Sequence, residues 1–120
     1  MHYPHQDPGP VPYIYDVDEH TFEAEVLEAS RRRLVMVDFW AAWCAPCVAL
    51  APTLEAVARE RDGAVALAKV EVDDNMRLAG RYKLRGFPTV ILFRDGEALA
   101  HFAGNRPLHW VREWVDEHLG

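Results

Sequence analysis

The pattern of hydrophobic and polar positions predicts strands and helices that alternate along the chain. Residues 34–40 are almost continuously apolar, which is typical of a central strand covered on both faces. Shorter alternating segments predict further strands, and apolar residues three and four positions apart predict helices. The expected strands are residues 11–16, 34–40, 65–72, 89–94 and 97–103, and helices are expected at about 21–30, 45–61, 75–82 and 105–119.

Capping residues mark where the helices should begin and end. Asp18 or Thr21 is expected to cap the first helix, which ends at the arginines 31–33. Those arginines fit a solvated helix end, although a docking patch for a partner stays open. Asn105 is expected to cap the last helix, and Pro52 predicts a bend in the second one.

The order of elements, βαβαβαββα, predicts an α/β domain in which helices flank a mixed central sheet. Functional groups are then expected where the strands end. The 120 residues, half of them hydrophobic, fit one globular domain, which we place at residues 11–120. Residues 1–10 contain three prolines among polar side chains and predict an extended or disordered arm without an assigned activity.

The charge of the chain excludes some classes of partner. Nineteen acidic residues against 13 basic ones give a net charge of −6, which argues against binding to nucleic acid or to an anionic membrane. No segment approaches the about 20 apolar residues of a membrane span. The first ten residues also lack the basic start and apolar stretch of a signal peptide. We therefore expect a cytoplasmic protein.

The strongest chemical signal is Cys44-Ala45-Pro46-Cys47, which holds both cysteines of the chain at the start of a predicted helix. Unpaired N–H groups and the positive end of the helix dipole make a sulfur there easier to ionise. The thiolate is the attacking species in disulfide exchange, so Cys44 is interpreted as the nucleophile and Cys47 as the resolving cysteine. In a reducing cytoplasm, such a pair is more often catalytic than structural.

Two other interpretations of the cysteine pair are weaker. A structural disulfide across so short a loop would constrain the unfolded chain very little. A zinc site needs about four ligands, and the six histidines show no paired metal-ligand spacing. We expect neither a metal nor a bound organic cofactor.

Asp38 is the second informative residue, because it interrupts the apolar segment that precedes the cysteines. A buried carboxylate is costly, and burial raises its pKa toward neutrality. The alternative is an aspartate at a strand end with ordinary hydrogen bonds.

Several of these residues together resemble the thioredoxin family, from about Val11 to the end of the chain. The resemblance implies the thioredoxin fold. It rests on residues 37–47 (VDFWAAWCAPC), followed by Pro52, Lys69, Asp73, the segment Gly86-Phe87-Pro88-Thr89, Gly96 and Gly104.

The resemblance also implies roles for catalytic residues. Cys44 and Cys47 would be the redox pair, and Asp38 would lie beneath Cys47 as its general base with Lys69 nearby. Pro88 would be a cis proline beside Cys44.

A flat apolar surface around the sulfurs is the expected docking site for substrates. Phe87 would offer its backbone to an extended substrate strand, and Gly104 would let that strand approach closely. Trp40 and Trp43 flank the site, and the expected binding residues are Trp43, Pro46, Phe87, Pro88 and Gly104.

By resemblance, the protein is a monomeric protein-disulfide reductase whose substrates are disulfide-containing proteins. An NADPH-dependent flavoprotein, thioredoxin reductase, would restore its dithiol. Ala45 and Phe87 depart from the residues that thioredoxins most often carry, so redox poise and partner choice are not assumed typical. The chain is also similar to the thioredoxin domain of bacterial chaperone-linked thioredoxin proteins. An oxidant or isomerase, and a binding module or co-chaperone, therefore remain alternatives.

Overall fold

The structure, a computed structural model, describes residues 10–120. The predicted N-terminal arm lies outside the described residues, apart from Pro10. None of the helices within residues 10–120 combines the length and the apolar character needed to cross a membrane.

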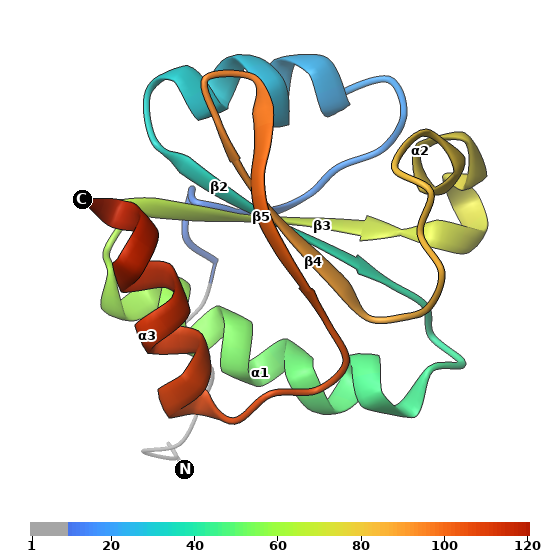
Figure 1. The fold of residues 1–120 in the computed structure, drawn as a ribbon. Helices are drawn as coiled ribbons and strands as arrows, with labels where there is room; N and C mark the ends of the chain where they lie inside the picture. Colours follow the sequence, from blue (N-terminus) through green and yellow to red (C-terminus); the bar gives the residue numbers. More distant parts are fainter. Residues whose placement is uncertain (1–9) are drawn as a thin grey trace, which may run out of the picture.

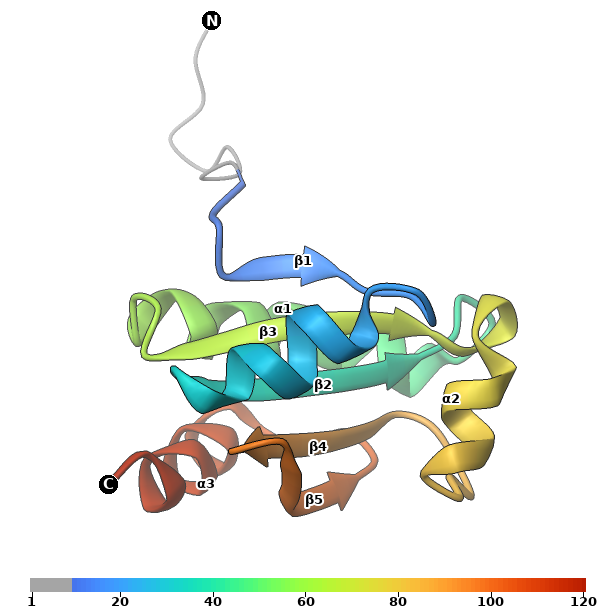
Figure 2. The same ribbon diagram turned by 90° about the horizontal axis from the view of Figure 1, so that it is seen from above.

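Five strands form one mixed sheet in the order β1-β3-β2-β4-β5 (Figure 2). The first three pair in parallel, β4 runs antiparallel to β2, and β5 runs antiparallel to β4. Three strands have the predicted bounds, whereas the first begins at residue 14 rather than 11 and the third ends at 71 rather than 72. The strands are β1 (Ile14–Asp16), β2 (Leu34–Trp40), β3 (Val65–Glu71), β4 (Thr89–Arg94) and β5 (Glu97–Ala103).

Helices cover both faces of this sheet, which confirms the predicted α/β architecture (Figure 1). On one face lie α1 (Ala45–Glu60) and α3 (Leu108–Leu119). The opposite face carries a π-helix, η1 (Glu23–Glu28), which continues into the 3₁₀ turn η2 (Ala29–Arg31). A further 3₁₀ turn, η3 (Val72–Asp74), leads into the short helix α2 (Met76–Arg81) beside the end of β3.

The predicted helix caps are partly wrong. The last helix starts at Leu108 with Pro107 as its N-cap, and no side chain caps it, so Asn105 lies too early. Asp18 instead closes a turn before the first helix, because its carboxylate accepts the N–H groups of His20 and Thr21 at 2.7 and 2.9 Å. Short polar side chains bond to nearby backbone in turns as readily as at helix starts.

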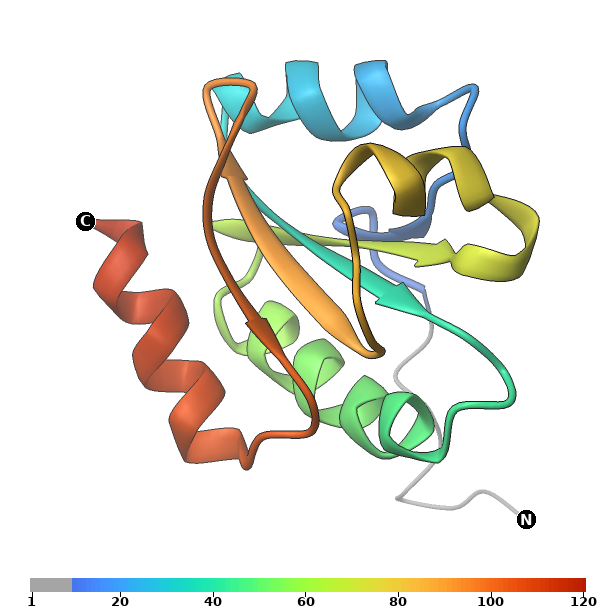
Figure 3. The same cartoon turned by 45° about the vertical axis from the view of Figure 1, so that its right-hand side comes forward.

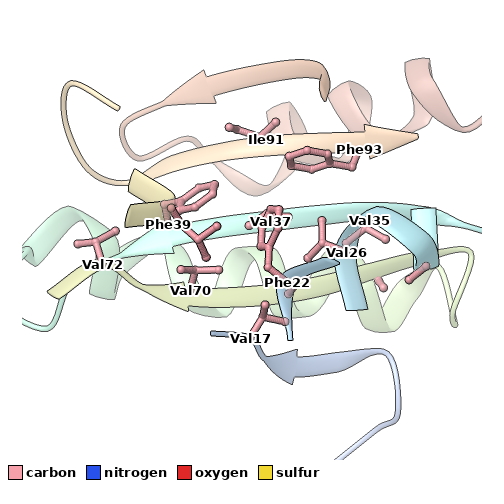
Figure 4. Close-up of a cluster of buried hydrophobic side chains, with 14 of the residues drawn as sticks. Val17, Phe22, Val26, Val35, Val37, Phe39, Val70, Val72, Ile91 and Phe93 are labelled. Carbon is pink, nitrogen blue, oxygen red and sulfur yellow. The ribbon is translucent and has the colours of Figure 1, made fainter. Parts of the chain in front are cut away.

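Side chains of β2 alternate between two buried layers, as expected for a central strand. Val35, Val37 and Phe39 pack among the residues beneath η1, where Figure 4 shows them beside Phe22 and Val26. Leu34 and Met36 face α1 and α3 on the other side. Asp38 belongs to this second row, so the alternation places a carboxylate in an apolar layer.

Ser30 connects the end of the first helical segment to the turn between β4 and β5. Its buried Oγ accepts the N–H of Gly96 at 2.8 Å and donates to the carbonyl of Leu27 at 2.7 Å. Its own carbonyl accepts the N–H of Asp95 at 2.9 Å.

Ser30→Ala is therefore expected to lower the free energy of unfolding by about 1–2 kcal/mol, because it leaves the Gly96 N–H without its partner. Urea denaturation measures this loss. The exposed neighbour Arg32 offers the control, since Arg32→Ala is expected to change stability by less than about 0.5 kcal/mol. Equal losses in both variants would contradict the role of the Ser30 hydroxyl.

Candidate active site

The cysteine pair lies where the chain passes from β2 into α1. Cys44 is the N-cap of α1, with an extended backbone, and its Sγ accepts the N–H of Cys47 at 3.2 Å. The sulfur thus occupies the position that a serine or aspartate oxygen takes at other helix starts. Pro46 fits the first turn, where no helical N–H bond is lost. The predicted place of Cys44 at the start of a helix is thus confirmed, and N–H groups at a helix start favour negative charge on a nearby sulfur.

Cys44 and Cys47 form a disulfide in the structure. Both residues are buried, but Cys44 is more accessible than Cys47, with exposed fractions of 5% and 1%. Of the two cysteines, Cys44 is thus the one more easily reached from outside the molecule.

A second loop faces the disulfide from the start of β4. The Phe87–Pro88 peptide bond is cis, as expected from the resemblance. The carbonyl oxygen of Phe87 lies 3.4 Å from the Sγ of Cys44, and the carbonyl oxygen of Pro88 accepts the N–H of Gly104 at 2.9 Å. The start of α1, the start of β4 and the end of β5 thus meet at one end of the sheet (Figure 3).

Trp43 is an exposed aromatic residue directly before the N-cap, with 67% of its surface accessible. Its ring contacts that of Phe87 edge to face, with ring centres 6.2 Å apart. Its indole Nε1 donates to the Oδ2 of Asp73 at 3.0 Å, a contact that sequence reasoning did not predict. Pro46 and Val48 are exposed nearby on α1, so apolar surface borders the cysteine pair.

Asp38 is buried on the α1 side of the sheet, with only 1% of its surface exposed. Its Oδ1 has no hydrogen-bond partner, unlike an ordinary aspartate at a strand end. Burial raises the pKa of Asp38 to about 7, while the charge of Lys69 lowers it and that of Glu55 raises it. The group can therefore gain or lose a proton near neutral pH.

Asp38 and Cys47 both line one cavity of about 170 Å³. Such a volume is large enough to hold water. The cavity is lined by Asp38, Trp40, Cys47, Val48, Ala51 and Lys69.

Lys69 lies beside Asp38 in the sheet register, as expected, but its ion pair is with another residue. Its Nζ lies 3.2 Å from the Oε2 of Glu55 and 6.0 Å from the centre of the Trp40 ring. Sequence reasoning missed Glu55. The signal was its spacing, because residues 47, 51 and 55 are four apart and follow one row on α1.

Within residues 10–120, no cluster of three or more histidine, cysteine, aspartate or glutamate side chains could hold a metal ion. The geometry itself brings together the two sulfurs and the carboxyl group of Asp38, and it is their chemistry that it supports.

Comparison with known proteins agrees with this chemistry. The family model described as Thioredoxin matches residues 13–117. The chain is 42% identical over 106 residues to a thioredoxin of Staphylococcus epidermidis, covering 88% of this chain and 98% of that protein. It is 38% identical over 106 residues to thioredoxin C-2 of Corynebacterium nephridii, which covers 88% of this chain and 96% of that protein. A thioredoxin of Bacillus subtilis is 35% identical over 106 residues, again covering 88% of this chain and 98% of that protein.

Proposed function

This chain belongs to the thioredoxin family and is a protein-disulfide reductase that cycles between a Cys44–Cys47 dithiol and disulfide, and we propose how its residues divide the reaction. The Cys44 thiolate attacks a substrate disulfide, forms a mixed disulfide and releases the first substrate thiolate. Cys47 then gives its proton to Asp38 and attacks the Sγ of Cys44, which releases the second substrate thiolate. The substrate gains two electrons, and the Cys44–Cys47 disulfide is left.

The position of Cys44 at the N-cap is the single observation that carries this proposal. The backbone N–H of Cys47 donates to the Sγ of Cys44 at 3.2 Å. A hydrogen bond to an anion is stronger than one to a neutral group. The same contact therefore favours the thiolate over the thiol.

Asp38 suits the role of base for Cys47. A base is most effective when its pKa lies near the working pH, and burial brings the pKa of Asp38 to about 7. We assign Lys69 the opposite effect on the pKa of Asp38. Its positive charge lowers this pKa, because it favours the ionised carboxylate, and so keeps Asp38 from staying protonated.

The proposed docking surface is the apolar region bordering the disulfide, formed by the accessible residues Trp43, Pro46, Phe87 and Gly104. Pro88, the fifth residue predicted for this surface, is itself buried and offers a substrate little area. Gly104 has a φ of +83°, and a Cβ built on it would meet no other atom within 4 Å. An extended substrate segment can therefore lie directly against this glycine and pair with the backbone near Phe87.

Trp43→Ala tests this surface. Because the exposed ring would be buried by a substrate, its loss is expected to lower kcat/KM for a protein disulfide by about tenfold, or about 1.5 kcal/mol of binding. The thermal midpoint should change little, since the ring is exposed. Leu99→Ala, which removes another exposed apolar side chain on β5, is the matched control. Equal effects of both variants on kcat/KM would count against docking at Trp43.

For its cellular setting, we propose a monomer in the cytoplasm that receives electrons from an NADPH-dependent thioredoxin reductase and passes them to protein disulfides. The test couples insulin reduction to NADPH oxidation with a bacterial thioredoxin reductase. NADPH consumption that requires this chain, the reductase and insulin together supports the proposal. Turnover with dithiothreitol but none with the reductase would refute this electron source. A redox potential well above that of cytosolic thiols would favour an oxidant or isomerase instead.

A further inference from the structure

Three carboxylates surround Lys69, and the structure pairs its ammonium with one of them. Asp38 on β2 and Asp16 on β1 flank Lys69 in register on either side within the sheet. Glu55 approaches from α1, and its Oε2 forms the ion pair with Lys69 at 3.2 Å. The Lys69 ammonium is therefore paired with the carboxylate on α1 rather than with either of the two carboxylates beside it in the sheet.

The pairing of Lys69 with Glu55 affects which groups surround the Asp38 carboxyl. From β3 it faces Lys69, from β4 it faces the apolar Val90, and from α1 it faces Cys47 and the charge of Glu55. Its Oδ1 has no hydrogen-bond partner, although the side chain is almost fully buried. A lysine paired directly with this group would stabilise the carboxylate and make it a poorer base.

We propose that Glu55 is a positioning residue, which holds the Lys69 ammonium away from Asp38 so that the Asp38 carboxyl stays free to exchange a proton with Cys47. This inference rests on the proposed role of Asp38 as the base of Cys47. Glu55 does not touch the reacting sulfurs. It acts through the position of Lys69 and through its own negative charge, and both oppose ionisation of Asp38.

The direct test is the titration of Asp38 in the disulfide form, in which neither sulfur titrates. Carbon-13 NMR of the Asp38 carboxyl reports its pKa in the intact protein. In Glu55→Gln, Lys69 is released to Asp38, and the pKa of Asp38 is expected to fall by about 1. Asp16→Asn is the matched control, because it removes the exposed carboxylate flanking Lys69 from β1 and should leave the pKa of Asp38 where it is.

A double variant identifies the route of the effect. With Lys69→Met already in place, Glu55→Gln is expected to lower the pKa of Asp38 much less than it does alone, because no ammonium remains to be repositioned. An unchanged titration of Asp38 in Glu55→Gln would overturn the proposal, as would an equal fall in Asp16→Asn.

Kinetics supply a readout that a purely stabilising ion pair would not move. In Glu55→Gln, the acid limb of the resolving step should shift to lower pH, and the plateau rate should fall about threefold, because a base loses efficiency as its pKa falls. Asp38→Asn tests the base role of Asp38 separately from the position of Lys69. If that variant resolves mixed disulfides at the wild-type rate, the base role of Asp38 fails, whereas the NMR titration still decides the position of Lys69.

Discussion

Cys44→Ser is expected to lower the rate of protein-disulfide reduction by at least about 1000-fold, because a serine hydroxyl does not ionise near neutral pH and cannot replace the thiolate nucleophile. The fold should persist, since a serine oxygen at the N-cap can still accept the N–H of Cys47. Insulin reduction, measured above the dithiothreitol background, reports the activity. The thermal midpoint reports the fold.

Cys47→Ser is expected to stop the same reaction halfway. Cys44 can still attack, but no second thiol is present to resolve the product, so a mixed disulfide with the substrate accumulates. A non-reducing gel or intact mass spectrometry detects this species. Trapping by Cys44→Ser instead of Cys47→Ser would reverse the two roles, and substantial turnover by Cys44→Ser would refute the mechanism.

The roles of Cys44 and Cys47 could be predicted from the sequence because they depend on the order of neighbouring strands and helices along the chain. The burial of β2 could be predicted from an almost continuous apolar segment. The turn between β4 and β5 could be predicted from Asp95-Gly96, whose φ angles of +54° and +82° are tolerated by these two residue types. The place of Cys44 at a helix start likewise follows from the strand before it and the helix after it.

Contacts between distant segments were harder to predict. Asn105 looked like a helix cap because the preference for asparagine is general, but a proline disfavours the helical conformation in the residue before it, so α3 starts only after Pro107. The ion pair of Lys69 with Glu55 joins a strand to a helix, and only tertiary packing decides which of three nearby carboxylates the ammonium meets. The hydrogen bond between Trp43 and Asp73 has the same origin.

Asp38→Asn is expected to make the disulfide form more stable at neutral pH while slowing the resolving step. The pKa of Asp38 rises from 3.8 to about 7 on folding, mainly because burial penalises the charged form. The folded protein thus binds this proton more tightly than the unfolded chain does. The resulting stabilisation is fully present below pH 3.8 and is lost as the pH rises toward about 7, and it corresponds to about 4 kcal/mol.

Asparagine is neutral throughout this range and does not carry that dependence on pH. The free energy of unfolding of Asp38→Asn relative to the wild type should therefore increase by about 4 kcal/mol between pH 4 and pH 8. Guanidinium denaturation of the oxidised proteins at both pH values measures this difference. Any constant cost of burying the amide cancels, because only the change with pH is compared.

The same substitution removes the proposed base, so resolution of a mixed disulfide near pH 7 should slow by about 100-fold. Stopped-flow measurements with the reduced proteins test this rate. A parallel pH dependence of stability in both proteins would show that Asp38 does not carry the buried charge. Greater stability at pH 8 with unchanged resolution would show that the carboxyl is costly to the fold without serving the reaction. Together, greater stability and slower resolution would show that the protein keeps a destabilising carboxyl in its core for the proton transfer that releases its substrate.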